Sequence, residues 1–124
     1  MCRIGASWVR QHILESHPHA KISVTAIWEP MLYGDSRDAI DREVLDDPRV
    51  VSLWDPHKLS GTWFAEHALA GLGGGGGYVV WDAYYAFGPG AAWHKQPSHA
   101  VAAGSDIIGN TSGLSRSFIP LLPR

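Results

Sequence analysis

The chain has 124 residues, of which 45% are hydrophobic and 18% are charged, and its formal net charge is -2 with histidine neutral. This length and balance indicate one globular domain with a modest core, and they exclude a wholly disordered chain. The lack of a basic excess argues against a nucleic-acid partner. No apolar run is long enough for a membrane-spanning helix and the first residues lack the features of a signal peptide, so we expect no membrane association and a cytoplasmic protein.

Local periodicity predicts the first helices and the first strand. Apolar residues at helical spacing predict a helix over residues 4–16. The alternation of residues 21–28 then predicts a strand. Residues 35–45 begin with a capping residue, and acidic residues follow them, which predicts a short helix. Ile40 and Val44 are the buried pair expected for this second helix.

The middle of the chain contains a strand followed directly by a helix. Residues 50–53 form an apolar strand, and Asp55 and Pro56 suit the cap and the first position of a helix. We expect this helix to reach about residue 70. Its expected core positions are Leu59, Trp63, Phe64 and Ala68.

The last part of the chain reads as a glycine loop, a hairpin and a tail. Gly73–Gly77 predicts a flexible loop, because it lacks the lysine and hydroxyl residue of a phosphate-binding loop. Residues 78–87 are apolar on both faces, which indicates an inner strand, and residues 91–93 are expected to pair with it. A further short strand is expected over 100–103, and an irregular tail over 116–124. This alternation predicts parallel pairing first and antiparallel pairing at the end.

The order of these elements resembles the thioredoxin-like fold, in the branch of peroxiredoxins and thiol–disulfide reductases. Leu53-Trp54-Asp55-Pro56 is similar to the Leu-Ser-Asp-Pro element that precedes a helix in that branch. Val79-Val80-Trp81-Asp82, with the turn Gly88-Pro89-Gly90, is similar to its strand–turn–strand element. The resemblance implies an α/β fold, a thioredoxin-like three-layer sandwich, as a single domain over residues 1–115.

The chain also departs from the family pattern. The family uses a Cys-x-x-Cys motif at the start of a helix, whereas this chain has one cysteine, Cys2, which would match the second. The cis-proline that the family carries before its hairpin has no counterpart. The strand that precedes the redox motif is also missing, so the resemblance implies a truncated or degenerate relative whose mixed sheet lacks this strand.

A missing central strand has consequences for assembly. It leaves the backbone groups of two neighbouring strands unpaired, and each buried orphan costs about 1–3 kcal/mol. A second copy can complement the sheet, so we expect a homo-oligomer, in the simplest case a dimer.

Two residues are candidates for catalysis. Cys2 stands at the start of the first predicted helix, where N–H dipoles favour a thiolate, and is a candidate redox or nucleophilic thiol. Glu29 follows a predicted strand at its carboxyl end, where α/β folds place ligand-binding residues, and is a candidate proton shuttle beside the thiol. The alternatives are an inert thiol near a frayed end and a carboxylate at the rim.

The other polar residues are expected to be structural. Asp82 lies in an apolar strand and matches a structural position of the family. The seven histidines lack acidic or cysteine partners at the spacing of a metal site, and one cysteine excludes a multi-cysteine zinc site. We therefore expect no metal and no cofactor.

Two functions remain open. The first is a thiol–disulfide oxidoreductase, truncated or degenerate, with one remaining cysteine. The second is a non-enzymatic module on the same scaffold, which binds itself or a protein partner through open strand edges and a tryptophan-lined surface. Trp8 and Trp93 are expected at such a surface, whereas four are expected in the core: Trp28, Trp54, Trp63 and Trp81. A small-ligand pocket protein is a third option.

Overall fold

The computed structural model describes residues 3–31, 34–67 and 79–122. The helical elements in chain order are α1 (Arg3–Val9), η1 (Arg10–Glu15), η2 (Arg37–Ala39), α2 (Leu59–His67), η4 (Ile107–Gly109), α3 (Thr111–Gly113), η5 (Leu114–Phe118) and η6 (Ile119–Leu121). The strands are β1 (Val24–Trp28), β2 (Val50–Trp54), β3 (Ala83–Ala86), β4 (Trp93–His94), β5 (Gln96–Pro97) and β6 (Ala102–Ser105). The protein is therefore a mixed α/β fold, as predicted. Within the described ranges, no helix combines the length and apolar character needed to cross a lipid bilayer.

The N-terminal helical segment consists of α1 followed by the π-helical turns of η1, and confirms the helix predicted over residues 4–16. Its deepest side chain, Leu14, is fully buried. The guanidinium of Arg49 donates hydrogen bonds of 2.9 Å to three carbonyl oxygens at and just beyond its end, those of Leu14, His17 and Ala20. Arg49 thus satisfies carbonyls that a helix end leaves without an intrahelical partner.

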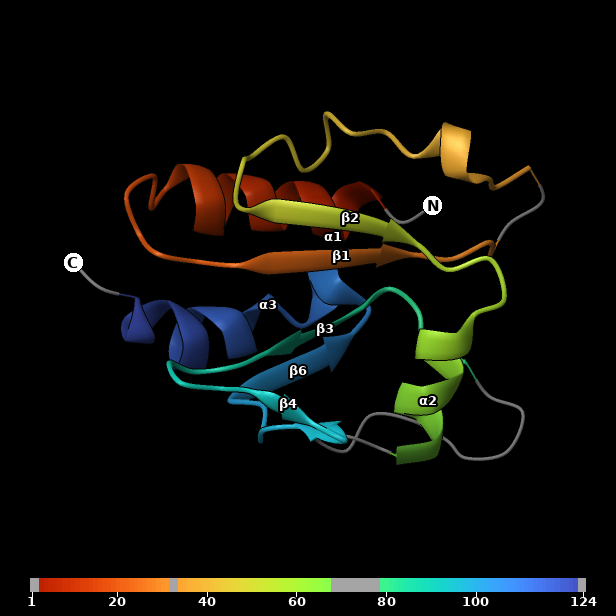
Figure 1. The fold of residues 1–124 in the computed structure, drawn as a ribbon. Coiled ribbons are helices and arrows are strands. Elements are labelled where there is room, and N and C mark those ends of the chain that lie inside the picture. Colours follow the sequence, from red (N-terminus) through yellow and green to blue (C-terminus); the bar gives the residue numbers. More distant parts are fainter. Residues whose placement is uncertain (1–2, 32–33, 68–78, 123–124) are drawn as a thin grey trace.

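β1 and β2 pair in parallel, as predicted for this part of the chain (Figure 1). The register runs from Val24 opposite Val50 to Trp28 opposite Trp54. The alternation predicted for residues 21–28 is confirmed over the strand itself, which begins at Val24. The buried and half-buried side chains of the pair lie on one face, toward the helices.

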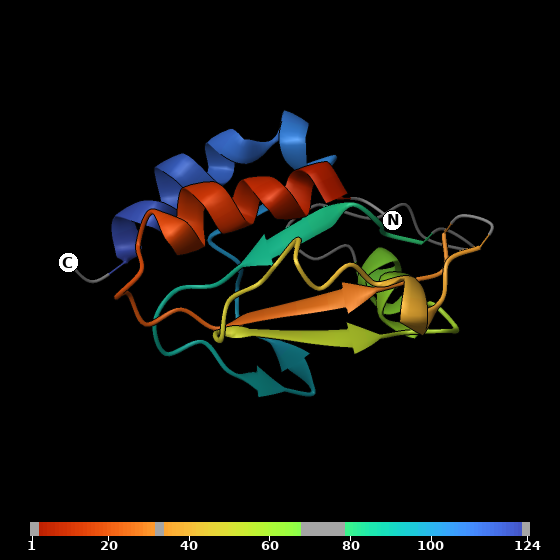
Figure 2. The same ribbon diagram turned by 90° about the horizontal axis from the view of Figure 1, so that it is seen from above.

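The other face of the β1–β2 pair is uncovered, and we call it the open face. It consists of Thr25, Ile27, Val51 and Leu53. The side chains of Ile27, Val51 and Leu53 are 43%, 55% and 48% exposed. Figure 2 shows α1 and α3 together on the opposite side of the pair. Parallel strands are usually covered on both faces, so this exposed apolar surface is unusual for its type.

The helix predicted over residues 35–45 is wrong, because the structure contains only the single turn η2 there. The side chain of Asp41 accepts a 3.0 Å hydrogen bond from the N–H of Glu43, which offers the backbone a local alternative to a helix. Ile40 and Val44 are nevertheless 9% and 7% exposed, so the predicted buried pair is confirmed.

α2 begins at Leu59, four residues after Asp55. Lys58, directly before it, has φ of 56°. This left-handed conformation is incompatible with a continuous α-helix, so the helix cannot run from the predicted start at Pro56 through Lys58. The residues that α2 buries are Gly61 and Ala65. Leu59 is 69% exposed, so its predicted core position is wrong. The expected C-terminal end of this helix and the glycine loop lie outside the described residues.

The strand pairing at the end of the chain differs from the predicted hairpin. β3 pairs with β6 in antiparallel orientation, so residues 83–86 oppose 102–105 rather than 91–93. β4 and β5 instead form a small ribbon of their own. The antiparallel pairing predicted for this part is confirmed. The single mixed sheet is not formed by the described strands, which make three separate two-stranded sheets.

The tail predicted to be irregular over residues 116–124 is helical as far as Leu121. Pro120 lies at the start of η6, where the missing N–H has no intrahelical partner to lose. Leu114, at the start of this run, packs in the core with Ile13 and Ala86. The C-terminal segment therefore closes the core between η1 and β3. It was mispredicted because its prolines were read as helix breakers.

Candidate functional site

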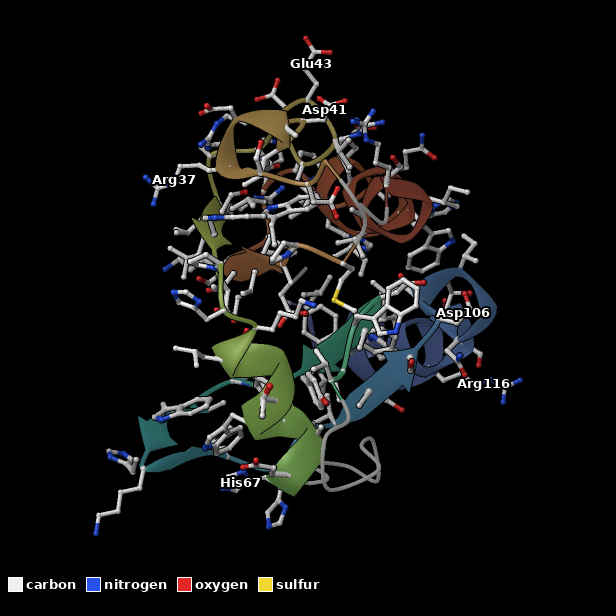
Figure 3. The ribbon with its side chains drawn as sticks, turned by 90° about the vertical axis from the view of Figure 1, so that its right-hand side faces the viewer. Arg37, Asp41, Glu43, His67, Asp106 and Arg116 are labelled. Carbon is white, nitrogen blue, oxygen red and sulfur yellow. The ribbon has the colours of Figure 1, made fainter. Side chains whose placement is uncertain are left out.

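The candidate site lies where β1 and β2 end and α2 begins. Because the two strands are parallel, Glu29 after β1 and Asp55 after β2 come to the same edge. Figure 3 views the molecule from this edge, with α2 in front. Cys2, the other predicted catalytic residue, lies outside the described residues.

Glu29 is half-buried, and its carboxylate connects β1 to α2. Its Oε1 accepts a 2.8 Å hydrogen bond from the N–H of Gly61 and lies 3.3 Å from Oγ of Ser60. A side-chain carbon at position 61 would collide with this same oxygen. The glycine inside α2, which weakens a helix intrinsically, is therefore explained by the close approach of the Glu29 carboxylate.

Asp55 holds the first turn of α2 from the end of β2. Its Oδ1 accepts the N–H of Leu59 at 3.0 Å, and its Oδ2 accepts the N–H of Ser60 at 2.8 Å. The hydroxyl of Ser60 also donates to Asp55 at 2.6 Å. The Ser60 hydroxyl is the donor toward both carboxylates, and because it has a single proton, the shorter bond to Asp55 is the stronger of the two.

The two carboxyl groups respond differently to the fold. Burial raises the pKa of Glu29, and the negative charge of Asp55 adds to this, against the hydrogen bond from Gly61. Burial would also raise the pKa of Asp55, but its hydrogen bonds with Ser60 and Leu59 outweigh burial and lower it. The environment thus moves the pKa values of the two groups apart, and Glu29 is the group that keeps its proton to higher pH.

This arrangement provides a proton donor or acceptor at the edge of a parallel strand pair. In the part of the chain that the structure describes, no three His, Cys, Asp or Glu side chains gather where they could hold a metal ion. The arrangement itself offers proton transfer and hydrogen bonding, with Glu29 as its group of raised pKa.

Asp82 does not belong to this cluster of contacts. Its backbone has φ of 47°, and its carboxyl accepts a hydrogen bond from the N–H of Ile107. Burial raises the pKa of Asp82, and repulsion from Asp106 adds to this. These contacts connect the residues before β3 to η4.

Two of the seven histidines stack on a tryptophan of their own helix. The ring of His12 lies 4.7 Å from that of Trp8, and the ring of His67 lies 3.8 Å from that of Trp63. In both pairs the Nδ1 atom also contacts the carbonyl oxygen of the tryptophan, four residues earlier. Local helical packing therefore accounts for these rings.

The tryptophans divide between core and surface. Trp28 is 8% exposed, which confirms its predicted core position, whereas Trp81 is 44% exposed and its predicted core position is wrong. Trp93 is 56% exposed and its ring lies 5.1 Å from that of Trp63. The surface position predicted for Trp93 is confirmed.

Sequence reasoning did not identify Asp55 and Ser60 as partners of Glu29. The signal was available, since both acidic residues directly follow strands that were predicted to be parallel. Comparison of the chain with protein-family models, with curated proteins and with solved structures finds no match. A functional proposal therefore rests on the order of the elements and on the residues of the site.

Proposed function

We propose that the chain is a thioredoxin-like protein, with a three-layer α/β architecture, that carries out thiol–disulfide exchange. The order of elements is the observation that carries this proposal. A helical segment begins at Arg3, directly after the single cysteine in the sequence, and the parallel β1–β2 pair, α2 and the antiparallel β3–β6 pair follow. Thiols beside the first turn of a helix have a lowered pKa and react as thiolates.

With one cysteine in the chain, the exchange proceeds through a mixed disulfide. The thiolate of Cys2 attacks one sulfur of a disulfide substrate and forms a new S–S bond, and the other sulfur leaves as a thiolate that takes up a proton. A thiol from outside the chain then attacks the Cys2 sulfur of the mixed disulfide and releases the second thiol of the substrate. A second external thiol attacks the disulfide that now joins Cys2 to the first external thiol, and releases Cys2. The substrate is reduced by two electrons, the external thiols are oxidised to a disulfide, and no cofactor takes part.

Glu29 is the proton-transfer group in this proposal. Its half-buried carboxyl lies at the carboxyl edge of the parallel pair, where α/β proteins assemble their sites. Since burial raises its pKa, it accepts a proton from the thiol more readily than an ordinary carboxylate and returns it to the leaving thiolate.

Reactivity of the thiol tests the proposal directly. Alkylation by iodoacetamide between about pH 5 and about pH 9 should show a midpoint below about 8.5, the value of an ordinary cysteine. Oxidised glutathione should add one glutathionyl group by mass spectrometry, and Cys2→Ser should abolish the adduct. Glu29→Gln should slow the exchange by about tenfold or more. A midpoint of an ordinary thiol, or no adduct, rejects the proposal.

The open face favours a second candidate, a non-enzymatic module that binds a second copy of itself. The face carries no charged side chain, and its exposed residues Ile27, Val51 and Leu53 are branched and apolar. Sheets pack face to face at about 10 Å, so two open faces can bury each other around a two-fold axis. This candidate predicts a dimer in solution together with an unreactive thiol.

A further inference from the structure

A hollow of about 360 Å³ lies beside β2, between the strand and the segment that follows η2. Its lining combines positive charge with an apolar wall. The residues are Arg37, Ile40, Arg42, Ser52, Leu53 and Trp54. This volume is in the range of pockets that bind small molecules. The hollow is separate from the contacts of Glu29 described above, because neither Glu29 nor its partners line it.

The two arginines of the hollow have no ion-pair partner among the described residues. Other arginines of the chain do: Arg3 pairs with Asp41 at 3.5 Å, and Arg49 with Asp47 at 2.8 Å. Both Arg37 and Arg42 are exposed, and Figure 3 shows Arg37 beside β2 with its guanidinium turned outward from the chain. Both arginines line the hollow, and their long side chains can bring two guanidinium groups to an oxyanion bound there.

Acidic residues on the same segment do not cancel this charge at the hollow. The carboxylate of Asp41 forms an ion pair with Arg3 and accepts a hydrogen bond from the N–H of Glu43. Asp38 and Glu43 are exposed, and neither lines the hollow. The described side chains that line the hollow therefore include two positive charges and no negative charge.

The wall of the hollow is apolar. Ile40 is 9% exposed, Trp54 is half-buried, and Leu53 is 48% exposed. Among the described strands β2 pairs with β1 alone, so the edge beside the hollow is not occupied by another strand. An apolar group can pack on this wall while the anion that it carries reaches the arginines.

We propose that this hollow binds a small organic anion, namely a carboxylate or phosphate carried on a compact apolar group. Arg37 and Arg42 bind the oxyanion, and the wall of Ile40, Leu53 and Trp54 packs against the apolar group. This site is independent of thiol chemistry, since it uses neither Cys2 nor Glu29.

Titration with phenyl phosphate tests the proposal, by calorimetry and by NMR of the tryptophan indole N–H groups. Saturable binding should shift the indole resonance that Trp54→Phe removes. Arg37→Ala and Arg42→Ala should each weaken binding by about tenfold, the loss of one charge-assisted contact, and should leave the fold unchanged by circular dichroism. Arg116→Ala is the matched control, because it removes an arginine from the C-terminal helical run, far from Arg37 in Figure 3.

Further ligands identify what the hollow recognises. Inorganic phosphate and phenol each carry one half of the probe and should bind at least about tenfold more weakly than phenyl phosphate. Benzoate tests the source of the anion: tighter binding of benzoate assigns the site to carboxylates, and tighter binding of phenyl phosphate assigns it to phosphate esters. The proposal is overturned if neither binds at about 10 mM, if both arginine variants bind unchanged, or if inorganic phosphate binds as tightly as phenyl phosphate.

Discussion

Glu29 and Asp55 both contact the start of α2, but the pKa values of their carboxyl groups are shifted in opposite directions. Both contact Ser60, but Asp55 accepts its hydroxyl proton and two backbone N–H groups, whereas Glu29 is the more desolvated group. The pKa of Glu29 is therefore raised and that of Asp55 lowered. A raised folded-state pKa means that the folded protein binds this proton more strongly than the unfolded chain does.

The raised pKa of Glu29 should be visible in how the stability of the protein depends on pH. The stability that protonated Glu29 contributes is complete below its unfolded pKa, about 4.5, and is lost as pH rises through the raised folded pKa. Glu29→Gln keeps the carbonyl acceptor for Gly61 without ionising. We therefore expect the free energy of unfolding of the variant, relative to wild type, to increase as pH rises from about 4.5 toward neutrality.

Urea unfolding at several pH values measures this difference. Glu66→Gln is the matched control, since it removes the charge of an exposed glutamate on the same helix. A Glu29→Gln difference that does not vary with pH would show that the fold does not perturb the Glu29 carboxyl.

Tyr84 and Tyr85 are adjacent in β3 and differ in how their hydroxyl groups are satisfied. Oη of Tyr84 donates a 2.8 Å hydrogen bond to the carbonyl of Asn110. Oη of Tyr85 is buried and has no hydrogen-bond partner among the described residues. A buried hydroxyl without a partner costs about 1–3 kcal/mol, whereas a satisfied one contributes about 1 kcal/mol.

The corresponding phenylalanine variants should move stability in opposite directions. Tyr84→Phe should lower the free energy of unfolding by about 1 kcal/mol, and Tyr85→Phe should raise it by a similar amount. The stacking of Tyr85 on Phe64, with ring centroids 4.4 Å apart, is retained by phenylalanine. Thermal and urea unfolding of both variants give the comparison, and destabilisation by Tyr85→Phe would mean that its hydroxyl is satisfied in solution.

At the scale of elements, Arg49 fixes the N-terminal helical segment to the start of β2. Its guanidinium binds both carboxylate oxygens of Asp47 at 2.8 Å, in addition to the three carbonyl oxygens at and just beyond the end of η1. The side chains of Arg49 and Asp47 are only 17% and 14% exposed. One planar, five-donor group thus connects three parts of the chain.

Replacing Arg49 should destabilise the protein strongly. Arg49→Ala should lower the free energy of unfolding by about 2–4 kcal/mol, because charge-assisted bonds are lost and carbonyl groups lose their partners. Arg49→Lys keeps the charge but not the fork, and should recover less than half of this. Arg3→Ala is the control, because its ion pair with Asp41 is exposed and should be worth less than about 1 kcal/mol.

The same contact predicts an acid limit. Hydrogen bonds from Arg49 lower the pKa of Asp47 to about 2. A lowered folded-state pKa contributes stability that is present above the unfolded value, 3.8, and is lost as pH falls toward 2. Acid unfolding monitored by circular dichroism should therefore be less steep in Arg49→Ala than in wild type, and equal slopes would contradict this.

Local patterns predicted the elements whose structure depends on near neighbours. The N-terminal helix, β1, β2 and the edge that carries Glu29 follow from periodicity and from parallel pairing. The pairing of β3 with β6 was missed because residues 102–105, Ala-Ala-Gly-Ser, have low strand propensity and are defined by a distant partner. The glycine at position 104 was a sequence signal for the close approach of β3 and β6, since a side-chain carbon there would meet the ring of Tyr84.

The site was predictable to the same extent. The position of Glu29 at a strand end was visible in the sequence, but the Ser60 and Gly61 contacts depend on where α2 begins, and that start was predicted three residues early, at Pro56. The hollow with Arg37 and Arg42 arises because residues 35–45 form one turn rather than a helix. Tertiary contacts therefore decide these features, and local propensity does not.

At the scale of the whole molecule, the described strands form three pairs instead of one sheet. One consequence is the open face of the β1–β2 pair, which no other described sheet covers. Helices lie on the opposite side of β1 and β2 (Figure 2), so the apolar side chains of the open face contact solvent in the monomer. Burying this face against a second copy removes it from water without bringing charges together.

The oligomeric state tests this directly. We expect light scattering after size exclusion at micromolar concentration to give twice the 13.5 kDa mass of the chain. Val51→Asp places a carboxylate in the middle of the apolar contact and should shift the protein to monomer, because the buried charge would lack a partner. Val51 is 55% exposed in the single chain and does not line the arginine hollow, so folding and anion binding should survive. Ile4→Asp, on the 71% exposed Ile4 of α1, is the control that should remain dimeric. A monomeric wild type, or a dimer that Val51→Asp leaves intact, would exclude the open face as the interface.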